Sequence, residues 1–271
     1  MRCRDRKRER GAALVSVLAI IAVAATIATG LVQQRAVEVV RTESIKSARQ
    51  ADSLLHGLEN HLLRALAARR GMTQLYGDDS CQSPRVPIAV ESMAVQVQLN
   101  NLHCRFNINS IGGSAQADDF FVNLVDSLTL QGRIDGIDGR VLRASIAGWT
   151  DPTTIAPYPT ATGGIQYNAS QPFRSVSELA LLPEVSVSEW QQLAGYLTAV
   201  PTGKHGVDTT IAPTVLGNAA RDTNAGSHAG APRFVQAELS VLIDERTFYS
   251  CVVMDLERSS FSLREQAPCL R

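Results

Sequence analysis

The sequence predicts an α+β fold, and three observations indicate it. A stretch without proline runs from residue 12 to about residue 70 and continues into helical periodicity. Segments with two-residue alternation lie at both ends of the rest of the chain, at about 86–108 and 232–264. Helical patterns fill the interval between them. We therefore expect one long N-terminal helix, two separated groups of strands, and helices between those groups.

The apolar stretch at residues 12–32 contains no charged residue. A helix of that length spans the ~30 Å hydrocarbon core of a bilayer. The basic cluster before it, at residues 2–10, favours a cytoplasmic N-terminus with the rest of the chain outside. Two alternatives stay open. One is a cleavable secretory signal with Ala22-Val23-Ala24 as its small-x-small site, and the other is a buried core helix, which the flanking charges disfavour.

An amphipathic helix follows the apolar stretch without a stop signal and ends near Gly71. Apolar or small residues recur at steps of three and four, and charged residues occupy the other faces. A secretory signal normally ends in a broken, extended segment, so this continuity favours a retained helix. The stripe consists of Val37, Val40, Ser44, Ala48, Ala51, Leu55, Leu58, Leu62 and Leu66.

The two groups of strands enclose a region with helical signals. Residues 117–130 and 138–149 each place apolar side chains on one side of a helix. Within the second group of strands, Asp-Glu-Arg around residue 245 predicts a hairpin turn. The interval 152–172 is rich in Pro, Gly and Thr, and a loop of that length indicates a function or an insertion.

Two capping boxes predict a compact helix–turn–helix hairpin. Ser175 is followed three residues later by Glu178, and Ser186 is followed in the same way by Glu189. In this pattern each side chain satisfies a free backbone N–H group at the start of a helix. Pro183 lies between the two predicted helices and ends the first one.

Five cysteines divide between the basic cluster and the rest of the chain. Cys3 lies in the cluster, and the other four lack the Cys-x-x-Cys spacing of a zinc or redox site. In an oxidising compartment four cysteines can form two disulfides with three alternative connectivities. Short loops close most easily, so we prefer Cys81–Cys104 with Cys251–Cys269. The alternative is that some of these cysteines are free and buried.

Catalytic motifs are missing from the sequence. It contains no Gly-x-Ser-x-Gly elbow, no His-Glu-x-x-His, no P-loop and no Gly-x-Gly-x-x-Gly. The formal net charge is zero, and the chain beyond residues 2–10 has no basic surplus. Nucleic-acid-binding proteins depend on clustered positive charge, so the composition does not favour that function either. We expect neither an enzyme nor a nucleic-acid-binding protein.

The start of the chain resembles that of type IV pilins and type II secretion pseudopilins. The shared features are a basic leader ending in Arg10-Gly11 and a long helix, apolar in its first half and amphipathic in its second. The resemblance implies that prepilin peptidase cuts between Gly11 and Ala12 and methylates the new N-terminus at Ala12. Most members carry Glu five residues after the cut, whereas this chain has Ser16 there.

The missing Glu indicates a particular place within that family. The Glu is thought to neutralise the N-terminus of a neighbouring subunit, and a lone carboxylate in an apolar core is costly. A subunit at the filament tip has no later neighbour above it and can lack the Glu. Ser16 and the Arg-Gly-x-Ala-Leu start are therefore similar to the minor pseudopilins of the general secretion pathway protein K family.

The body of the chain resembles the same family in the order of its short motifs. Asn107 and Asn109, Trp149 and Asp151, and the Ser-x-x-Glu-Leu segment at Ser175 stand in corresponding positions. The resemblance implies a small antiparallel pilin-like sheet packed on the long helix, with a helical domain inserted into it. The implied divisions are a leader at 1–11, a transmembrane half-helix at 12–32, an amphipathic half-helix at 33–70, a split sheet domain at 71–108 and 226–271, and an inserted domain at 109–225.

The family can bind calcium through acidic residues of the insert, but this chain departs from that pattern. Ca²⁺ takes six to eight oxygen ligands, usually including several carboxylates. The corresponding loop, 152–168, has no acid. Asp151 remains as the one candidate ligand, which is too few, so we expect no metal and no other cofactor.

The resemblance implies a structural assembly protein at the tip of a periplasmic pseudopilus, which helps to assemble it for export of folded proteins across the outer membrane. The implied partners are the minor pseudopilins I and J, the major pseudopilin and prepilin peptidase. The implied location is the inner membrane, crossed once, with a periplasmic C-terminal domain. The alternatives are a minor pilin of a type IV pilus and an exported periplasmic enzyme or binding protein.

Overall fold

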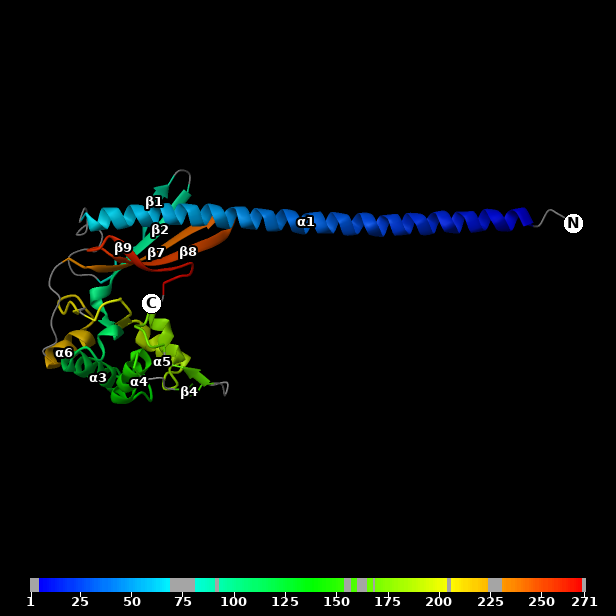
Figure 1. Cartoon of the computed structure of the whole chain (residues 1–271). Helices are drawn as coiled ribbons and strands as arrows, with labels where there is room; N and C mark the ends of the chain where they lie inside the picture. Colours follow the sequence, from blue (N-terminus) through cyan, green and yellow to red (C-terminus); the bar gives the residue numbers. More distant parts are fainter. Residues whose placement is uncertain are drawn as a thin grey trace. The chain divides into compact units, whose positions relative to one another are not determined.

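A computed structural model describes residues 5–68, 81–90, 93–153, 157–159, 165–167, 169–203, 206–223 and 231–269 (Figure 1). By its internal contacts the chain divides into two units, Met1–Ser53 and Leu54–Arg271. The boundary falls inside helix α1 (Asp5–Ala67), so this helix contributes to both units.

Helix α1 confirms the predicted long N-terminal helix. It has 63 residues, begins within the basic cluster and ends three residues before the predicted limit at about residue 70. Isolated helices gain stability with length because nucleation is costly and propagation is not. No proline interrupts the segment, so one nucleus serves the whole run.

A five-stranded antiparallel sheet combines the two predicted groups of strands. Its order is β1-β2-β7-β8-β9, and β2 and β7 join the early group to the late group. At the β7–β8 turn, Asp244 and Glu245 have φ values of 49° and 63°, so both adopt the left-handed conformation of a two-residue hairpin turn. The predicted turn at this position is confirmed. The strands are β1 (Val86–Val90), β2 (Met93–Asn101), β7 (Phe234–Ile243), β8 (Arg246–Asp255) and β9 (Ser260–Glu265).

One face of this sheet is covered by the last turns of α1. Ser250 of β8 donates a 2.6 Å hydrogen bond from Oγ to Oε1 of Glu59, and Nε of Arg264 in β9 lies 2.9 Å from Glu59 Oε2. Burial of apolar side chains on both elements supplies the main stabilisation here. The buried apolar side chains are Leu55, Leu58, Leu62 and Leu66 of α1, with Val95, Val97, Leu99, Val235, Ala237, Leu239, Val241, Val252 and Met254 of the sheet.

The first group of strands is shorter than predicted. The alternation was expected to continue to residue 108, but β2 ends at Asn101, and the chain then forms two 3-10 turns, η1 (Leu102–Cys104) and η2 (Ile108–Ser110). Asn101 and Asn107 cap these turns, since each side chain accepts a hydrogen bond from the backbone N–H two residues ahead. These local hydrogen bonds compete with a strand ladder.

Between β2 and β7 lies the insert, which has an apolar core of its own. Phe106 stacks on Phe120 with ring centroids 4.9 Å apart, and Trp149 is fully buried in the same cluster. Helix α6 was not predicted. The insert contains β3 (Phe106–Asn107), α3 (Ala115–Leu130), α4 (Gly139–Thr150), β4 (Pro157–Pro159), β5 (Ile165–Tyr167), η3 (Val176–Leu181), α5 (Val187–Ala194), β6 (Leu197–Thr198) and α6 (Thr214–Thr223).

Two predictions within the insert need correction. The first member of the helical hairpin is a 3-10 helix, η3, although its capping box at Ser175 and Glu178 is present. Leu182 precedes Pro183 and adopts an extended conformation, as residues before proline prefer, so the helix stops after six residues. The interval 152–172 is not only loop, because β4 and β5 pair antiparallel within it.

Candidate functional site

The exposed apolar part of α1 is the first candidate site. From Val17 to Val32 the large apolar side chains are 54% to 68% exposed. Within the described residues, one helix is long and apolar enough to cross a membrane, and it contains this stretch. So much exposed apolar surface indicates a surface that another apolar phase or protein covers. Gly11, Ala12 and Ser16 belong to the same helix, but their side chains lie outside the described part.

The predicted stripe of the amphipathic half-helix is exposed in its first part and buried in its last part. From Leu55 to Leu66 its members are buried, whereas Val37 and Val40 are 67% and 58% exposed. The early half of the stripe therefore adds to the exposed apolar surface of the helix. One expectation was wrong: charged residues do not all lie on the other faces, because Glu59 is fully buried among the leucines.

The second candidate site is the joint between the sheet and the insert, and two asparagines form its centre. Asn107 is fully buried, donates from Nδ2 to the carbonyls of Val200 and Thr202, and accepts from Val200 N at 3.1 Å. Asn109 donates to Phe173 O at 2.9 Å and accepts from Phe173 N at 2.8 Å. These two side chains fasten the beginning of the insert to segments 64 to 95 residues further along the chain.

His103 adds a third contact to the joint. It is 3% exposed, and its Nδ1 lies 2.9 Å from Gly206 O, while Arg233 N donates to its Nε2 at 3.2 Å. Its own carbonyl accepts from Asp208 N at 2.7 Å. One imidazole therefore connects the beginning of the insert to the segment between β6 and α6 and to the residue before β7. This role of His103 was not predicted from the sequence, because a single histidine belongs to no sequence motif and its partners are more than 100 residues away.

Two disulfides flank the joint, and they are the two pairs that the sequence favoured. Cys81 is bonded to Cys104 of η1, and Cys251 of β8 is bonded to Cys269. The first fixes the segment before β1 to the start of the insert. The second fixes the segment after β9 to the central part of the sheet.

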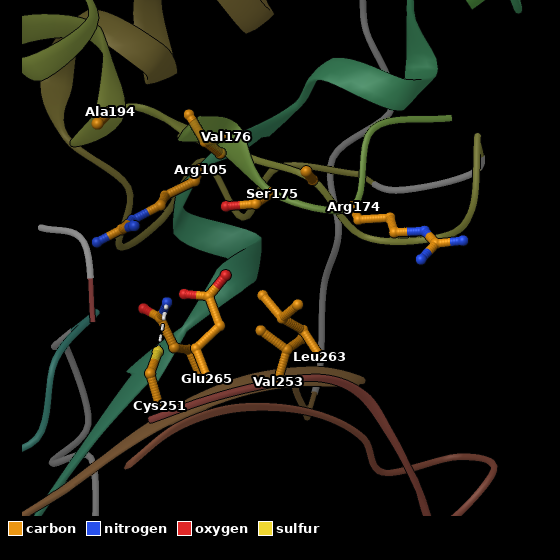
Figure 2. A pocket seen from close by; sticks show the side chains of 11 residues that line it. Arg105, Arg174, Ser175, Val176, Ala194, Cys251, Val253, Leu263 and Glu265 are labelled. Carbon is orange, nitrogen blue, oxygen red and sulfur yellow. Dashed lines mark hydrogen bonds between the residues drawn. The ribbon is translucent and has the colours of Figure 1, made fainter. Parts of the chain in front are cut away.

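A narrow cleft lies between the sheet and the insert (Figure 2). Burial lowers the pKa of the Arg105 guanidinium there, and Glu265 reaches into the cleft towards Ser175. The Ser175 hydroxyl already accepts a hydrogen bond from Ser177 N as a helix cap. Ser175 thus serves as the cap of η3 at the edge of the cleft.

Asp151, the candidate calcium ligand, caps a turn. Its Oδ1 accepts hydrogen bonds from Thr153 N at 2.8 Å and Thr153 Oγ1 at 2.7 Å. Across the described ranges, three or more His, Cys, Asp or Glu side chains nowhere come together as a metal-binding group. Asp151 therefore does not belong to such a group in that part of the chain, whereas Ca²⁺ usually takes several carboxylates among six to eight oxygen ligands.

A long helix with an exposed apolar part, an antiparallel sheet covering its end and helices inserted into that sheet form the α+β architecture that the sequence predicts. Residues 104–202 match the family model described as type II secretion system (T2SS), protein K. The match covers the insert from Cys104 to the end of β6, and it ends at Thr202, to which Asn107 is hydrogen-bonded.

Two similar proteins are also named as components of type II secretion systems. The type II secretion system protein K of Pectobacterium carotovorum subsp. carotovorum is 26% identical over 214 residues, which are 72% of this chain. The aligned part is 64% of that relative, so the chain spans slightly less than two thirds of its length. A solved chain of the GspK–GspI–GspJ complex of the enterotoxigenic Escherichia coli type 2 secretion system shares the fold, with a TM-score of 0.65 at 14% identity, over 84% of this chain and 100% of that one. These similarities confirm the predicted resemblance to protein K and the predicted fold class.

Proposed function

We propose that this chain is a minor pseudopilin of a type II secretion system and forms the tip of the periplasmic pseudopilus. The observation that carries the proposal is the insert: residues 104–202 match the protein K family model, and they interrupt a sheet that covers the end of a long apolar helix.

The exposed apolar helix serves first as an anchor and then as an assembly surface in this proposal. Residues 12–32 cross the inner membrane once, and the basic cluster keeps the N-terminus in the cytoplasm. When the subunit leaves the membrane, apolar helices of neighbouring subunits replace the lipid around Val17 to Val40. The exposure of these side chains supports the proposal, because burying them is favourable in either environment.

The insert gives the subunit a bulky head, which suits a filament tip. A head of this size blocks the addition of a further subunit above it. Ser16 supports the same position, since a tip subunit has no later neighbour whose N-terminus a Glu would neutralise. The partners we propose are the minor pseudopilins I and J, by analogy with the solved complex that shares the fold, together with the major pseudopilin.

Processing of the leader provides the test. We expect prepilin peptidase to cut after Gly11, so Gly11→Leu abolishes both leader removal and secretion, because the side chain obstructs the cut. Mass spectrometry of the N-terminus and a secretion assay measure the two effects. Gly30→Leu is the matched control, since a Cβ at Gly30 meets nothing within 4 Å. Normal processing and normal secretion in the Gly11 variant would refute the proposal.

The mature N-terminus also separates the alternatives. N-methylated Ala12 supports a pseudopilin or a minor pilin, whereas a start at Ala25 indicates an exported enzyme or binding protein. Co-purification of the full chain with pseudopilins I and J of its own secretion system distinguishes the pseudopilin from a pilin of a type IV pilus. The match of the insert to protein K favours the secretion system.

A further inference from the structure

The cleft between the sheet and the insert contains an arginine that is largely enclosed by protein. Arg105 follows η1 at the beginning of the insert, and its side chain lines the cleft (Figure 2). Enough protein surrounds the guanidinium that burial lowers its pKa. A charge taken out of water is costly unless an opposite charge or hydrogen bonds compensate for it. The Arg105 guanidinium therefore calls for a partner.

Protein groups within the described ranges do not supply that partner. The Arg105 backbone N–H donates to Leu102 O at 3.1 Å, but its guanidinium forms neither a hydrogen bond nor an ion pair with a described residue. An adjacent carboxylate raises the pKa of an arginine, as the hydrogen bond to Asp255 does for Arg233. The pKa of Arg105 is shifted in the opposite direction, which agrees with an uncompensated charge.

Two other charged residues among those described line the cleft, and neither is paired with Arg105. Glu265 of β9 lies on the opposite wall, with its carboxylate directed towards Ser175. Arg174 lies at the other end of the cleft, is exposed, and points in the opposite direction to Arg105 (Figure 2). Arg105 therefore faces a space that neither side chain fills.

A neutral hydrogen-bond donor lies on the floor of the same cleft. Gln236 of β7 accepts from Asn100 Nδ2 at 3.3 Å through Oε1, and its Nε2 donates to Cys251 Sγ at 3.5 Å. A side-chain amide carries two protons on its nitrogen, so the second one is available to a ligand. Gln236 and Arg105 both line the cleft, and both offer donors.

We propose that the cleft binds one carboxylate group, held by the Arg105 guanidinium and the Gln236 amide. The open space there is about 40 Å³, whereas one water molecule needs about 10–15 Å³, so there is room for a group of this size. Guanidinium groups bind carboxylates through two parallel hydrogen bonds. The carboxylate belongs either to a free anion or to an acidic side chain of another protein. Glu265 limits the affinity, because its like charge lines the same cleft.

The test titrates the full chain in detergent micelles with two probes that carry the same group. Acetate represents the free anion, and an acetylated and amidated Gly-Glu-Gly peptide presents the carboxylate on a side chain. Acetamide and the Gly-Gln-Gly peptide are their neutral controls. NMR follows the side-chain N–H signals of Arg105 and Gln236. We expect both signals to shift together and to saturate with acetate alone if the ligand is a free anion, and with the peptide too if a protein side chain can enter.

Three variants assign the binding to the cleft. Arg105→Met keeps an unbranched side chain without the charge, so the Gln236 signal should need at least about tenfold more probe, because charge-assisted hydrogen bonds are the strong ones. Glu265→Gln should bind about threefold tighter, because it removes a like charge from the cleft. Arg174→Met is the matched control and should leave the affinity unchanged, since Arg174 is exposed and points away from Arg105.

Three results would overturn the proposal. The first is that neither charged probe gives a saturable shift of the Arg105 signal, which would leave water as the group that solvates the guanidinium. The second is an equal response of Gln236 in Arg105→Met and in the unmodified chain. The third is weaker binding in Glu265→Gln. If Arg105→Met does not fold, the unmodified chain and Glu265→Gln still decide, since both retain Arg105.

Discussion

At the residue scale, Glu59 shows how a polar group is accommodated beneath a helix. Its carboxylate is fully buried, and its partners are Ser250, Arg264 and His56, the last at 3.4 Å through Nδ1. A buried charge needs such partners, because removal from water costs several kcal/mol. The partners come from β8, β9 and the preceding turn of α1, so they also fix the register of the helix on the sheet.

Removing either member of the Glu59–Arg264 pair should have unequal effects. Arg264→Leu leaves a fully buried carboxylate without its cation and should cost about 3 kcal/mol. Glu59→Leu should cost less, about 1 kcal/mol, because the Arg264 side chain is 32% exposed and can turn to water. Urea unfolding of the full chain in micelles measures both.

The control for this pair is Arg258→Leu. Arg258 is 72% exposed and lies 3.9 Å from Asp255, so its loss should change the free energy of unfolding by less than about 0.5 kcal/mol. If Arg264→Leu and Glu59→Leu lowered the free energy of unfolding by the same amount, the predicted asymmetry would be wrong. The claim that the Glu59 carboxylate depends on its cation because it is buried would then also be wrong.

At the element scale, the two disulfides stabilise segments that have little secondary structure of their own. They close loops with sequence separations of 23 and 18 residues. Closing such loops lowers the entropy of the unfolded chain, and loops of this length are worth about 3 kcal/mol each in that description. Their similar lengths predict similar contributions to global stability.

Cys81→Ser with Cys104→Ser, and Cys251→Ser with Cys269→Ser, should each lower the free energy of unfolding by about 3 kcal/mol. The measurement is urea unfolding of each double variant beside the oxidised chain. Reduction of the unmodified chain provides the control, since it should reproduce the combined loss. A double variant as stable as the oxidised chain would show that its disulfide constrains nothing.

Elements with local signals could be predicted from the sequence, and elements that depend on distant partners could not. Ser186 and Glu189 correctly predicted the start of α5, because both members of a capping box are close in sequence. Between Asn101 and residue 108 the alternation predicted strand throughout, but only Phe106–Asn107 is strand there. Its turns are capped locally by Asn101 and Asn107. Its position in the fold depends on hydrogen bonds to Val200 and Phe173, which are far away in sequence.

The same distinction holds for the candidate site. The apolar stretch and the cysteine pairs follow from composition and loop length, so they were visible in the sequence. Glu59 and His103 were not, because each becomes a structural group only when residues 130 to 191 positions away are brought to it. A pattern in a single sequence carries no information on such contacts.

At the scale of the whole molecule, the apolar helix should determine where the chain resides. Ile21→Lys places a charge in the middle of the predicted span, where insertion scales assign a cost of about 3 kcal/mol. We expect this variant to shift from the membrane to the soluble fraction on alkaline extraction. Val40→Lys is the matched control, because Val40 is exposed to a similar degree but lies outside 12–32. Extraction of both variants in equal amounts would contradict the span.

The split sheet also has a consequence for how the chain acquires its structure. Asn100 and Gln236 are bonded neighbours on β2 and β7 although 136 residues separate them in the sequence. As the chain emerges from its N-terminus, the β1–β2 hairpin must wait for β7, and a two-stranded hairpin alone is only marginally stable. The core of the insert, from Phe106 to Ala220, is complete before β7 appears. We therefore expect the insert to fold first and the sheet to close last, around the two ends of a domain that has already formed.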